Sequence, residues 1–306
     1  MPRLSEPSKA ASLDLVRRAS IIRATVFGVW LITIATTPYI SYCELPSDMR
    51  VFRGFGGLVW WALLKLGGVS LASVVVQFVK WLGVGLCGLS ILWPNRLQLA
   101  TPGAFASILF LDALTKSATG YANHAQLIAL VLAAILTCFW RHKFHSPLDK
   151  PRRSAYSSDP YELIIWITAL AIVLPYTFIG INRLLEGGIQ VLTGDAILDY
   201  VRRNSLRDSR FGFTLFVHLT SVPIGAVLLK LGFAVTTAFE VLSVGVFVWP
   251  RFRLAWLLII GTFHIVTLLS MNILFWENAV LIYAVVGLGL GPLALGKRES
   301  RMRTTV

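Results

Sequence analysis

The sequence predicts an all-α membrane protein, a polytopic bundle of about eight transmembrane helices with additional interfacial helices. Hydrophobic residues make up 56% of the 306 residues, the mean hydropathy is +0.71, and only 14% of the residues are charged. Soluble globular chains carry roughly 25% charged residues. The apolar runs extend over nearly the whole chain and leave no stretch for a separate soluble core. We therefore expect a single membrane domain over residues 1–306.

About eight apolar runs approach the ~20 residues that a helix needs to cross a bilayer. In chain order they are Ala24–Tyr42, Val69–Trp93, Pro102–Lys116, Tyr121–Trp140, Tyr161–Ile181, Lys230–Trp249, Leu254–Asn272 and Trp276–Leu293. The third run is short, and we expect it to be tilted or partly re-entrant.

Three further segments are expected at the membrane surface rather than across it. They are Gly54–Leu66 with its paired tryptophans, a surface helix or lid within Asn182–Phe211, and Phe213–Leu229, which we expect to be broken at Pro223. Such segments combine apolar residues with charged or interface-seeking ones.

Lysine and arginine gather at the ends of the apolar runs. They are frequent in residues 1–23, 141–153, 251–253 and 294–306, all of which fall on one side of the predicted topology. The positive-inside rule makes this side the cytoplasm. An even number of helices then places the basic tails 1–23 and 294–306 in the cytoplasm, and we predict a location in the cytoplasmic (inner) membrane.

The net charge of +13 is explained by the same flanking pattern. Basic residues next to membrane spans interact with anionic lipid, whereas nucleic-acid binding proteins interleave them with exposed aromatic residues. The expected partner is therefore membrane lipid, and we expect no nucleic acid.

Familiar catalytic and metal-binding motifs are missing from the sequence. Cys43, Cys87 and Cys138 are widely separated, without a CxxC pair or the Cys/His spacing of a zinc site, so no metal site is expected. The chain also has no Gly-rich phosphate loop, no G-x-S-x-G elbow and no H-E-x-x-H helix. Any chemistry must come from polar residues inside the membrane.

Polar and ionisable residues inside a membrane span are costly, so each is a candidate functional residue. On the predicted topology they fall in the external half of the membrane and on inward-facing helix sides, and we predict that they line a polar chamber open to the extracytoplasmic side. They are Asp112, Asn123, His124, Asn182, Arg183, Glu240, His264, Asn272, Glu277 and Asn278.

Each candidate also has a structural alternative. An intramembrane histidine can bond a carbonyl of a neighbouring helix, and Glu240 can pair with Arg183 as a bridge between helices. Lys80 is expected to make a helix–helix bond or to reach the membrane surface rather than to act chemically.

Three blocks of residues carry a family resemblance. They are Phe110–Asp112 with Ala122–His124, then Tyr176–Leu184, and finally Phe239-Glu240 with Phe263-His264 and Ile273–Phe275. In this order and spacing they resemble the vitamin K-dependent γ-carboxylase family, in particular its short HTTM (horizontally transferred transmembrane) relatives. The resemblance covers roughly Ala24 to Pro292, nearly all of the membrane part.

The resemblance implies a set of site residues and a class of ligand. His124, His264, Glu240 and Arg183 would be catalytic, and Asn123, Tyr176, Asn182 and Asn272 would contact substrate or ligand. In the full carboxylases this domain oxidises vitamin K hydroquinone with oxygen, which creates a strong base that deprotonates glutamate before carbon dioxide adds. A quinone or hydroquinone cofactor is implied, as is a lipophilic small molecule or a secreted peptide as partner.

The chain departs from the family at one position and in its length. Where the family carries two lysines, this chain has Asn182 and Arg183. An arginine stays protonated and cannot accept a proton at physiological pH. The chain also ends soon after the last predicted helix, so the extramembrane domain that holds the carboxylases' protein substrate is not expected.

Two hypotheses about function follow from these residues. In the first, an enzyme or enzyme-like protein binds a quinone-like or lipid-linked molecule and modifies a substrate, such as a secreted peptide, at the external half of the bilayer. In the second, a non-catalytic accessory, immunity or transport component has kept the fold and lost the chemistry. His124, His264 and Glu240 favour the first hypothesis, and Arg183 favours the second.

Overall fold

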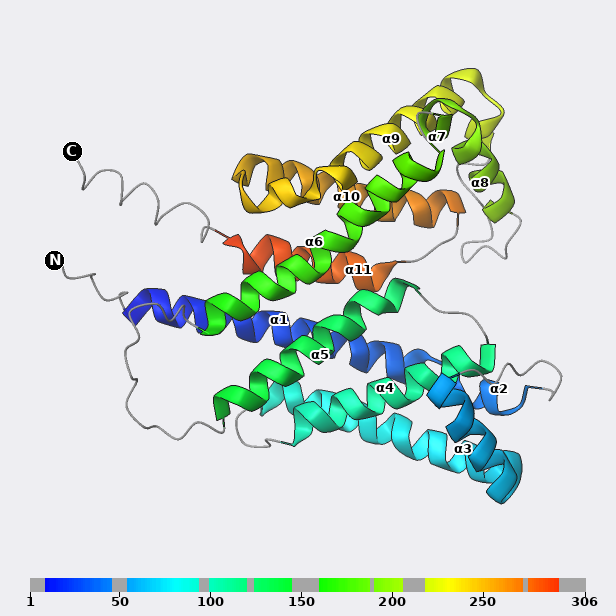
Figure 1. The fold of residues 1–306 in the computed structure, drawn as a ribbon, viewed down its shortest axis with the longest axis vertical. Coiled ribbons are helices and arrows are strands. Elements are labelled where there is room, and N and C mark those ends of the chain that lie inside the picture. The colour runs from blue at the N-terminus through cyan, green and yellow to red at the C-terminus, as the bar shows by residue number, and fades with distance from the viewer. Residues whose placement is uncertain are drawn as a thin grey trace. The chain divides into compact units, whose positions relative to one another are not determined.

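The computed structural model of this chain describes residues 9–45, 54–93, 99–119, 124–144, 160–187, 190–205, 218–271 and 275–291 (Figure 1). All regular secondary structure in these ranges is helical, which confirms the predicted all-α class. The chain forms two compact units, Met1–Ile164 and Ile165–Val306, and each is described by itself. The single membrane domain stays a prediction.

Five segments are long and apolar enough to cross a membrane: Leu13–Thr36, Gly57–Leu92, Tyr161–Gly187, Pro223–Val241 and Pro250–Leu269. The helices are therefore those of a multi-pass membrane protein in length and composition. The predicted eight spans are not confirmed. The apolar stretches Gln126–Phe139 and Trp276–Gly289 are shorter, and the helix that holds the third predicted run carries Asp112 and Lys116.

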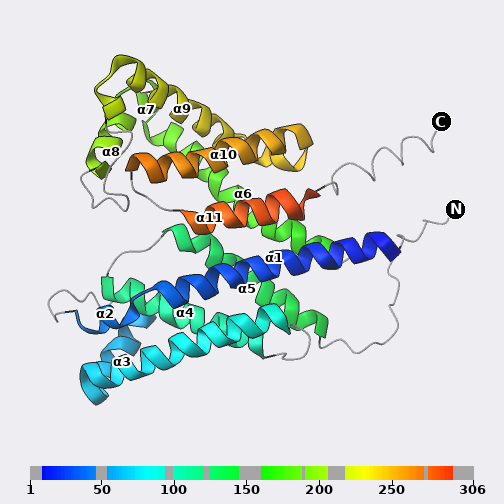
Figure 2. The same ribbon diagram turned by 180° about the vertical axis from the view of Figure 1, so that it is seen from behind.

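The first unit contains α1 (Lys9–Thr36), α2 (Tyr39–Cys43), α3 (Gly54–Leu92), α4 (Ala100–Thr119) and α5 (His124–Phe144). Helix α1 packs against α3 and α5, and α3 packs along α4 (Figure 2). Trp30 of α1 is buried, and its indole N–H donates a hydrogen bond of 3.0 Å to the carbonyl of Ala129 in α5. The first predicted run extends to Tyr42, but Pro38 separates α1 from the short α2.

Helix α3 is interrupted at Gly67 and Gly68. Gly68 has φ 65° and ψ −160°, a conformation that only glycine adopts readily. The interruption separates residues 54–66 from residues 69–92, which are the predicted surface stretch and the predicted second span. The sequence therefore located this break correctly, while the position of residues 54–66 at a membrane surface stays a prediction.

The second unit contains most of α6 (Pro160–Gly187) and the elements that follow it. They are α7 (Gln190–Thr193), α8 (Ala196–Ser205), the 3-10 turn η2 (His218–Thr220), α9 (Pro223–Val241), the 3-10 turn η3 (Ser243–Phe247), α10 (Pro250–Met271), α11 (Trp276–Leu281) and the π-helix η4 (Ile282–Gly289). Helix α10 contacts α8, α9, α11, η3 and η4. It is therefore the central helix of this unit.

The bounds of α9 bear on two predictions. The chain is interrupted before Pro223, as predicted, since η2 ends at Thr220 and α9 begins at Pro223. Residues 223–229 nevertheless belong to a helix that is long and apolar enough to cross a membrane. A proline fits in the first turn of a helix because it lacks only an N–H that has no partner there. The helix ends at Val241 and is followed by η3, so the predicted run Lys230–Trp249 is not one helix. Residues 213–217 of the predicted interfacial segment lie outside the described residues.

Helix α8 provides a surface helix within the predicted loop Asn182–Phe211. Its apolar residues Ile197, Leu198 and Val201 are buried against Ala226, Leu229 and Phe233 of α9. Its charged residues, including Arg203, are exposed. The apolar side of α8 is therefore covered by protein.

Candidate functional site

Helices α6 and α9 approach closely at Gly180. A Cβ atom at this glycine would lie 2.7 Å from the backbone nitrogen of Val241 and 2.9 Å from the Cβ of Glu240, closer than real Cβ atoms come. Only glycine fits here without a shift of one helix. One turn further along α6 is Arg183, which this approach brings beside Glu240.

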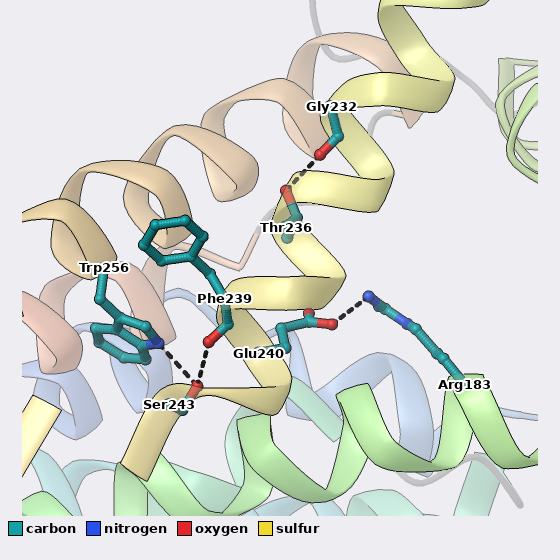
Figure 3. A network of polar contacts seen from close by, with 7 residues as sticks. All are labelled: Arg183, Gly232, Thr236, Phe239, Glu240, Ser243 and Trp256. Atoms are coloured by element: carbon teal, nitrogen blue, oxygen red, sulfur yellow. Dashed lines mark hydrogen bonds and ion pairs between the residues drawn. The ribbon is translucent and has the colours of Figure 1, made fainter. Parts of the chain in front are cut away.

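Arg183 and Glu240 form an ion pair in which an N–H of the guanidinium donates to the carboxylate (Figure 3). The Glu240 side chain is 1% exposed and that of Arg183 is 27% exposed. The guanidinium carbon lies 5.1 Å from the ring centroid of Phe233 and 6.0 Å from that of Phe263. Arginine stacks well on aromatic rings, so the pair is held by charge, hydrogen bonding and ring contact together.

Tyr176 and His264 form a second buried pair, with 2.7 Å between the phenol oxygen and the Nε2 atom of the imidazole. The Tyr176 ring makes an edge contact with Trp256, with 5.7 Å between centroids. Phe263 and Phe275 each lie 5.6 Å from the imidazole by ring centroids. Phe263 thus contacts both His264 and Arg183, and the two pairs share this aromatic wall.

Three buried polar atoms on helices of the same unit have no hydrogen-bond partner among the residues that the structure describes. They are Thr237 Oγ1 on α9, His264 Nδ1 on α10 and Asn278 Oδ1 on α11. A buried polar atom without a partner costs about 1–3 kcal/mol of stability. These atoms are therefore the ones that a bound polar group would satisfy.

Ser243 and Trp256 fix the end of α9 beside this site (Figure 3). The indole N–H of Trp256 donates to the Ser243 hydroxyl at 2.8 Å, and that hydroxyl donates to the carbonyl of Phe239 at 2.9 Å. This chain of bonds also orients the indole that contacts Tyr176. The sequence analysis missed Trp256, which lies two residues after the start of the predicted run Leu254–Asn272, where a tryptophan is common at a membrane interface.

The structure brings together four of the predicted site residues, Tyr176, Arg183, Glu240 and His264, all within the second unit. Asn182 lies on α6 with an exposed side chain. Asn123 and Asn272 fall outside the described residues, and so does the side chain of His124, which begins α5 in the first unit.

The polar chamber and its opening to the external side stay predictions, because they require His124 and the membrane side. Of the two roles weighed for Glu240, the bridge to Arg183 is present in the structure. Bonding between these side chains does not by itself separate a structural role from a ligand-binding one.

Comparison with known proteins gives no match to a family model, to a curated protein or to a solved structure. The resemblance to the γ-carboxylase family therefore rests on the three sequence blocks alone.

Proposed function

We propose that this chain is a multi-pass membrane protein whose second unit binds a lipophilic small molecule at Tyr176 and His264, beside the Arg183–Glu240 pair. One observation carries the proposal: the buried imidazole bonds Tyr176 through Nε2, while its Nδ1 has no partner among the described residues. Aromatic rings surround this atom, so a ligand that reaches it must be largely apolar with a hydrogen-bonding head group.

The hydrogen-bond chemistry of this pair suits a quinone, the ligand class that the sequence resemblance implies. A neutral imidazole has one donor and one acceptor nitrogen. If Tyr176 donates to Nε2, Nδ1 carries the hydrogen and can donate to a quinone carbonyl. If Nε2 donates to Tyr176, Nδ1 can accept from a hydroquinone hydroxyl. The same two residues can therefore hold both oxidation states of such a ligand.

Arg183 would position the site rather than exchange protons. It cannot act as a base, but it neutralises the buried Glu240 and holds α6 against α9. We propose that His264 is the residue able to transfer a proton to or from the ligand. The substrate proposed to be modified is a secreted peptide or a lipid-linked molecule at the external half of the bilayer.

A second candidate function is a non-catalytic accessory, immunity or transport component. It is favoured by the engagement of Arg183 with Glu240 at the helix end where the γ-carboxylase family carries lysines. In this case the ligand would be bound without being consumed.

Mass spectrometry of lipids extracted from the purified full-length protein tests the binding. We expect the wild-type protein to carry a lipophilic molecule that His264→Leu loses and that His218→Leu retains, because His218 is an exposed histidine of the same unit. If His264→Leu and His218→Leu carry equal amounts of the molecule, the proposed site at His264 is excluded.

Incubation of the same protein with a short-chain hydroquinone separates the two candidate functions. Oxidation of the hydroquinone by dissolved oxygen, faster with the wild-type protein than in buffer alone and not accelerated by His264→Leu, would support an enzyme. Binding without oxidation would support the accessory or transport role.

A further inference from the structure

A second polar cluster, which the proposed function does not use, lies in the first unit, one helical turn from the point where α1, α3 and α4 meet. A Cβ atom at Gly83 of α3 would lie 3.1 Å from the Cβ of Ser107 in α4 and 3.5 Å from the Cδ1 of Ile34 in α1. One turn before Gly83 in α3 is Lys80. This turn of α3 lies beside the C-terminal end of α1.

Lys80 closes the end of α1. Its ammonium donates a hydrogen bond of 3.1 Å to the carbonyl of Thr37, the residue between α1 and Pro38, which also accepts a hydrogen bond of 3.0 Å from the backbone N–H of Tyr39. This is the helix–helix bond expected for Lys80. The same ammonium lies 5.9 Å from the ring centroid of Tyr39 and 5.6 Å from that of Trp81. A carbonyl and two ring faces attract the charge without neutralising it.

Asp112 and Lys116 of α4 lie at nearly the same level. Helices α3 and α4 run antiparallel, because Gly83 faces Ser107 while Gly103 faces Leu86. With 1.5 Å of rise per residue, Lys80 is ~4.5 Å beyond the Gly83 contact and Asp112 is ~7.5 Å beyond it, in the same direction.

The charges of this cluster are unequal. Asp112 accepts a hydrogen bond of 2.6 Å from Lys116, and their side chains are 6% and 28% exposed. Helix α2, which carries Tyr39, packs against both α3 and α4, and this brings the Asp112–Lys116 pair of α4 to the side of the unit where Lys80 faces Tyr39. The carboxylate of Asp112 pairs with Lys116, and Lys80 makes no ion pair with a described residue, so its positive charge is not compensated within the described part of the cluster.

We propose that Lys80 and Lys116 bind the phosphate group of an anionic membrane lipid. The cluster lies level with the end of the apolar segment Leu13–Thr36, and on this ground we place it at the level of the lipid head groups. Lys80 itself belongs to the apolar segment Gly57–Leu92, whose 36 residues exceed the ~20 that a bilayer requires. Beside Lys80, the side chains of Phe78 and Trp81 are more than half exposed on α3 and provide apolar surface for an acyl chain. This apolar surface favours a lipid over free phosphate. The proposal is independent of the ligand proposed for the second unit.

Native mass spectrometry of the full-length protein in detergent, titrated with phosphatidylglycerol, tests this site. Each basic residue near a membrane surface contributes enough attraction that Lys80→Met should weaken binding about fivefold. Lys65→Met is the matched control, since Lys65 is an exposed lysine of the same helix, and it should bind as the wild type does. Asp112→Asn should strengthen binding, because it removes the negative charge that competes for Lys116.

Titrations with phosphatidylcholine and with inorganic phosphate identify the source of the phosphate. We expect weaker binding of phosphatidylcholine and no displacement of phosphatidylglycerol by millimolar phosphate. Displacement by phosphate alone would overturn the lipid assignment. Wild-type affinity in Lys80→Met, or an equal loss in Lys65→Met, would overturn the site. If Lys80→Met cannot be purified, Asp112→Asn provides the test instead: binding of phosphatidylglycerol that is unchanged or weaker in this variant would overturn the site.

Discussion

At the scale of single residues, the second unit buries a carboxylate that depends on one partner. Glu240 is almost fully buried, and its described ionic partner is Arg183. Removing one member of a buried pair leaves the other charge without compensation, which is more costly than the net gain from the pair itself. The pair is therefore a sensitive point for stability.

Arg183→Ala should lower the free energy of unfolding by at most ~3–5 kcal/mol, the range for a fully buried ion pair that loses one member, because the Arg183 side chain is 27% exposed. The double variant Arg183→Ala/Glu240→Gln should be more stable than Arg183→Ala alone, because the stranded charge is gone. Arg203→Ala, an exposed arginine on α8, is the control and should change little. Thermal unfolding in detergent measures all three. If Arg183→Ala lowers the stability no more than Arg203→Ala does, the structural role proposed for Arg183 is contradicted.

Arg183→Lys separates the structural role of this residue from a ligand-binding role. Lysine keeps the charge beside Glu240 but loses the planar fork that recognises an anionic group with two bonds. Because Arg183 is proposed to position the site through Glu240, we expect this variant to fold and to keep the co-purifying lipophilic molecule. A stable Arg183→Lys protein that has lost the molecule would show that Arg183 contacts the ligand itself.

Asp195 provides a pH-dependent contact outside the spanning segments. A hydrogen bond of 2.6 Å from Lys230, together with the charge of that lysine, lowers the pKa of Asp195. A carboxyl whose pKa is lower in the folded state contributes stability above its unfolded pKa, near 4, and loses it as the pH falls through the folded pKa. Asp195→Asn should therefore lower stability slightly at pH 7 and not at pH 2. An equal effect at both pH values in thermal unfolding would contradict this assignment.

At the scale of elements, glycine and proline positions decided how well the sequence could be interpreted. Gly67 and Gly68 mark the interruption of α3, because the positive φ of Gly68 is a local feature that disfavours residues with a side chain. Pro223 marked an interruption correctly but not the helix that follows it, since a proline can either start a helix or break one. The end of α9 depends on the bond between Ser243 and Trp256, thirteen residues apart, which no local pattern contains.

Gly180→Ala tests the close approach of α6 and α9. The added methyl group would meet the backbone of Val241, which cannot rotate away as a side chain can. We expect a loss of ~1–3 kcal/mol from overpacking and weaker coupling between Arg183 and Glu240. Gly232→Ala is the matched control, because nothing lies within 4 Å of its Cβ position and alanine favours a helix. Equal thermal stability of the two variants would show that the helices can separate freely.

The candidate site could be predicted from the sequence only as a set of residue types. Tyr176, Arg183, Glu240 and His264 were identified because polar groups are rare in apolar runs. Their pairing depends on the approach of α6 to α9 and α10, a tertiary feature that spacing along one helix does not contain. For this reason the sequence named Arg183–Glu240 only as one alternative and did not indicate that Tyr176 bonds His264.

At the scale of the whole molecule, the number of spans determines where the termini lie. The five segments that meet the length and hydropathy requirements are an odd number, and alone they would place the termini on opposite sides. The expected even count requires α4, the Gln126–Phe139 stretch of α5 and the Trp276–Gly289 stretch to cross as well. Helices this short or charged can cross when neighbouring helices cover their polar groups.

Both termini are expected in the cytoplasm, because the basic residues of the tails follow the positive-inside rule. Single cysteines replacing Ser5 and Ser300, in a background without the three native cysteines, should resist an impermeant thiol reagent in whole cells and react after permeabilisation. Arg203→Cys, on the exposed side of α8 in the predicted external loop, should react in intact cells. Labelling at only one of the two tails would establish an odd number of spans, and then α4 or one of the short apolar stretches does not cross.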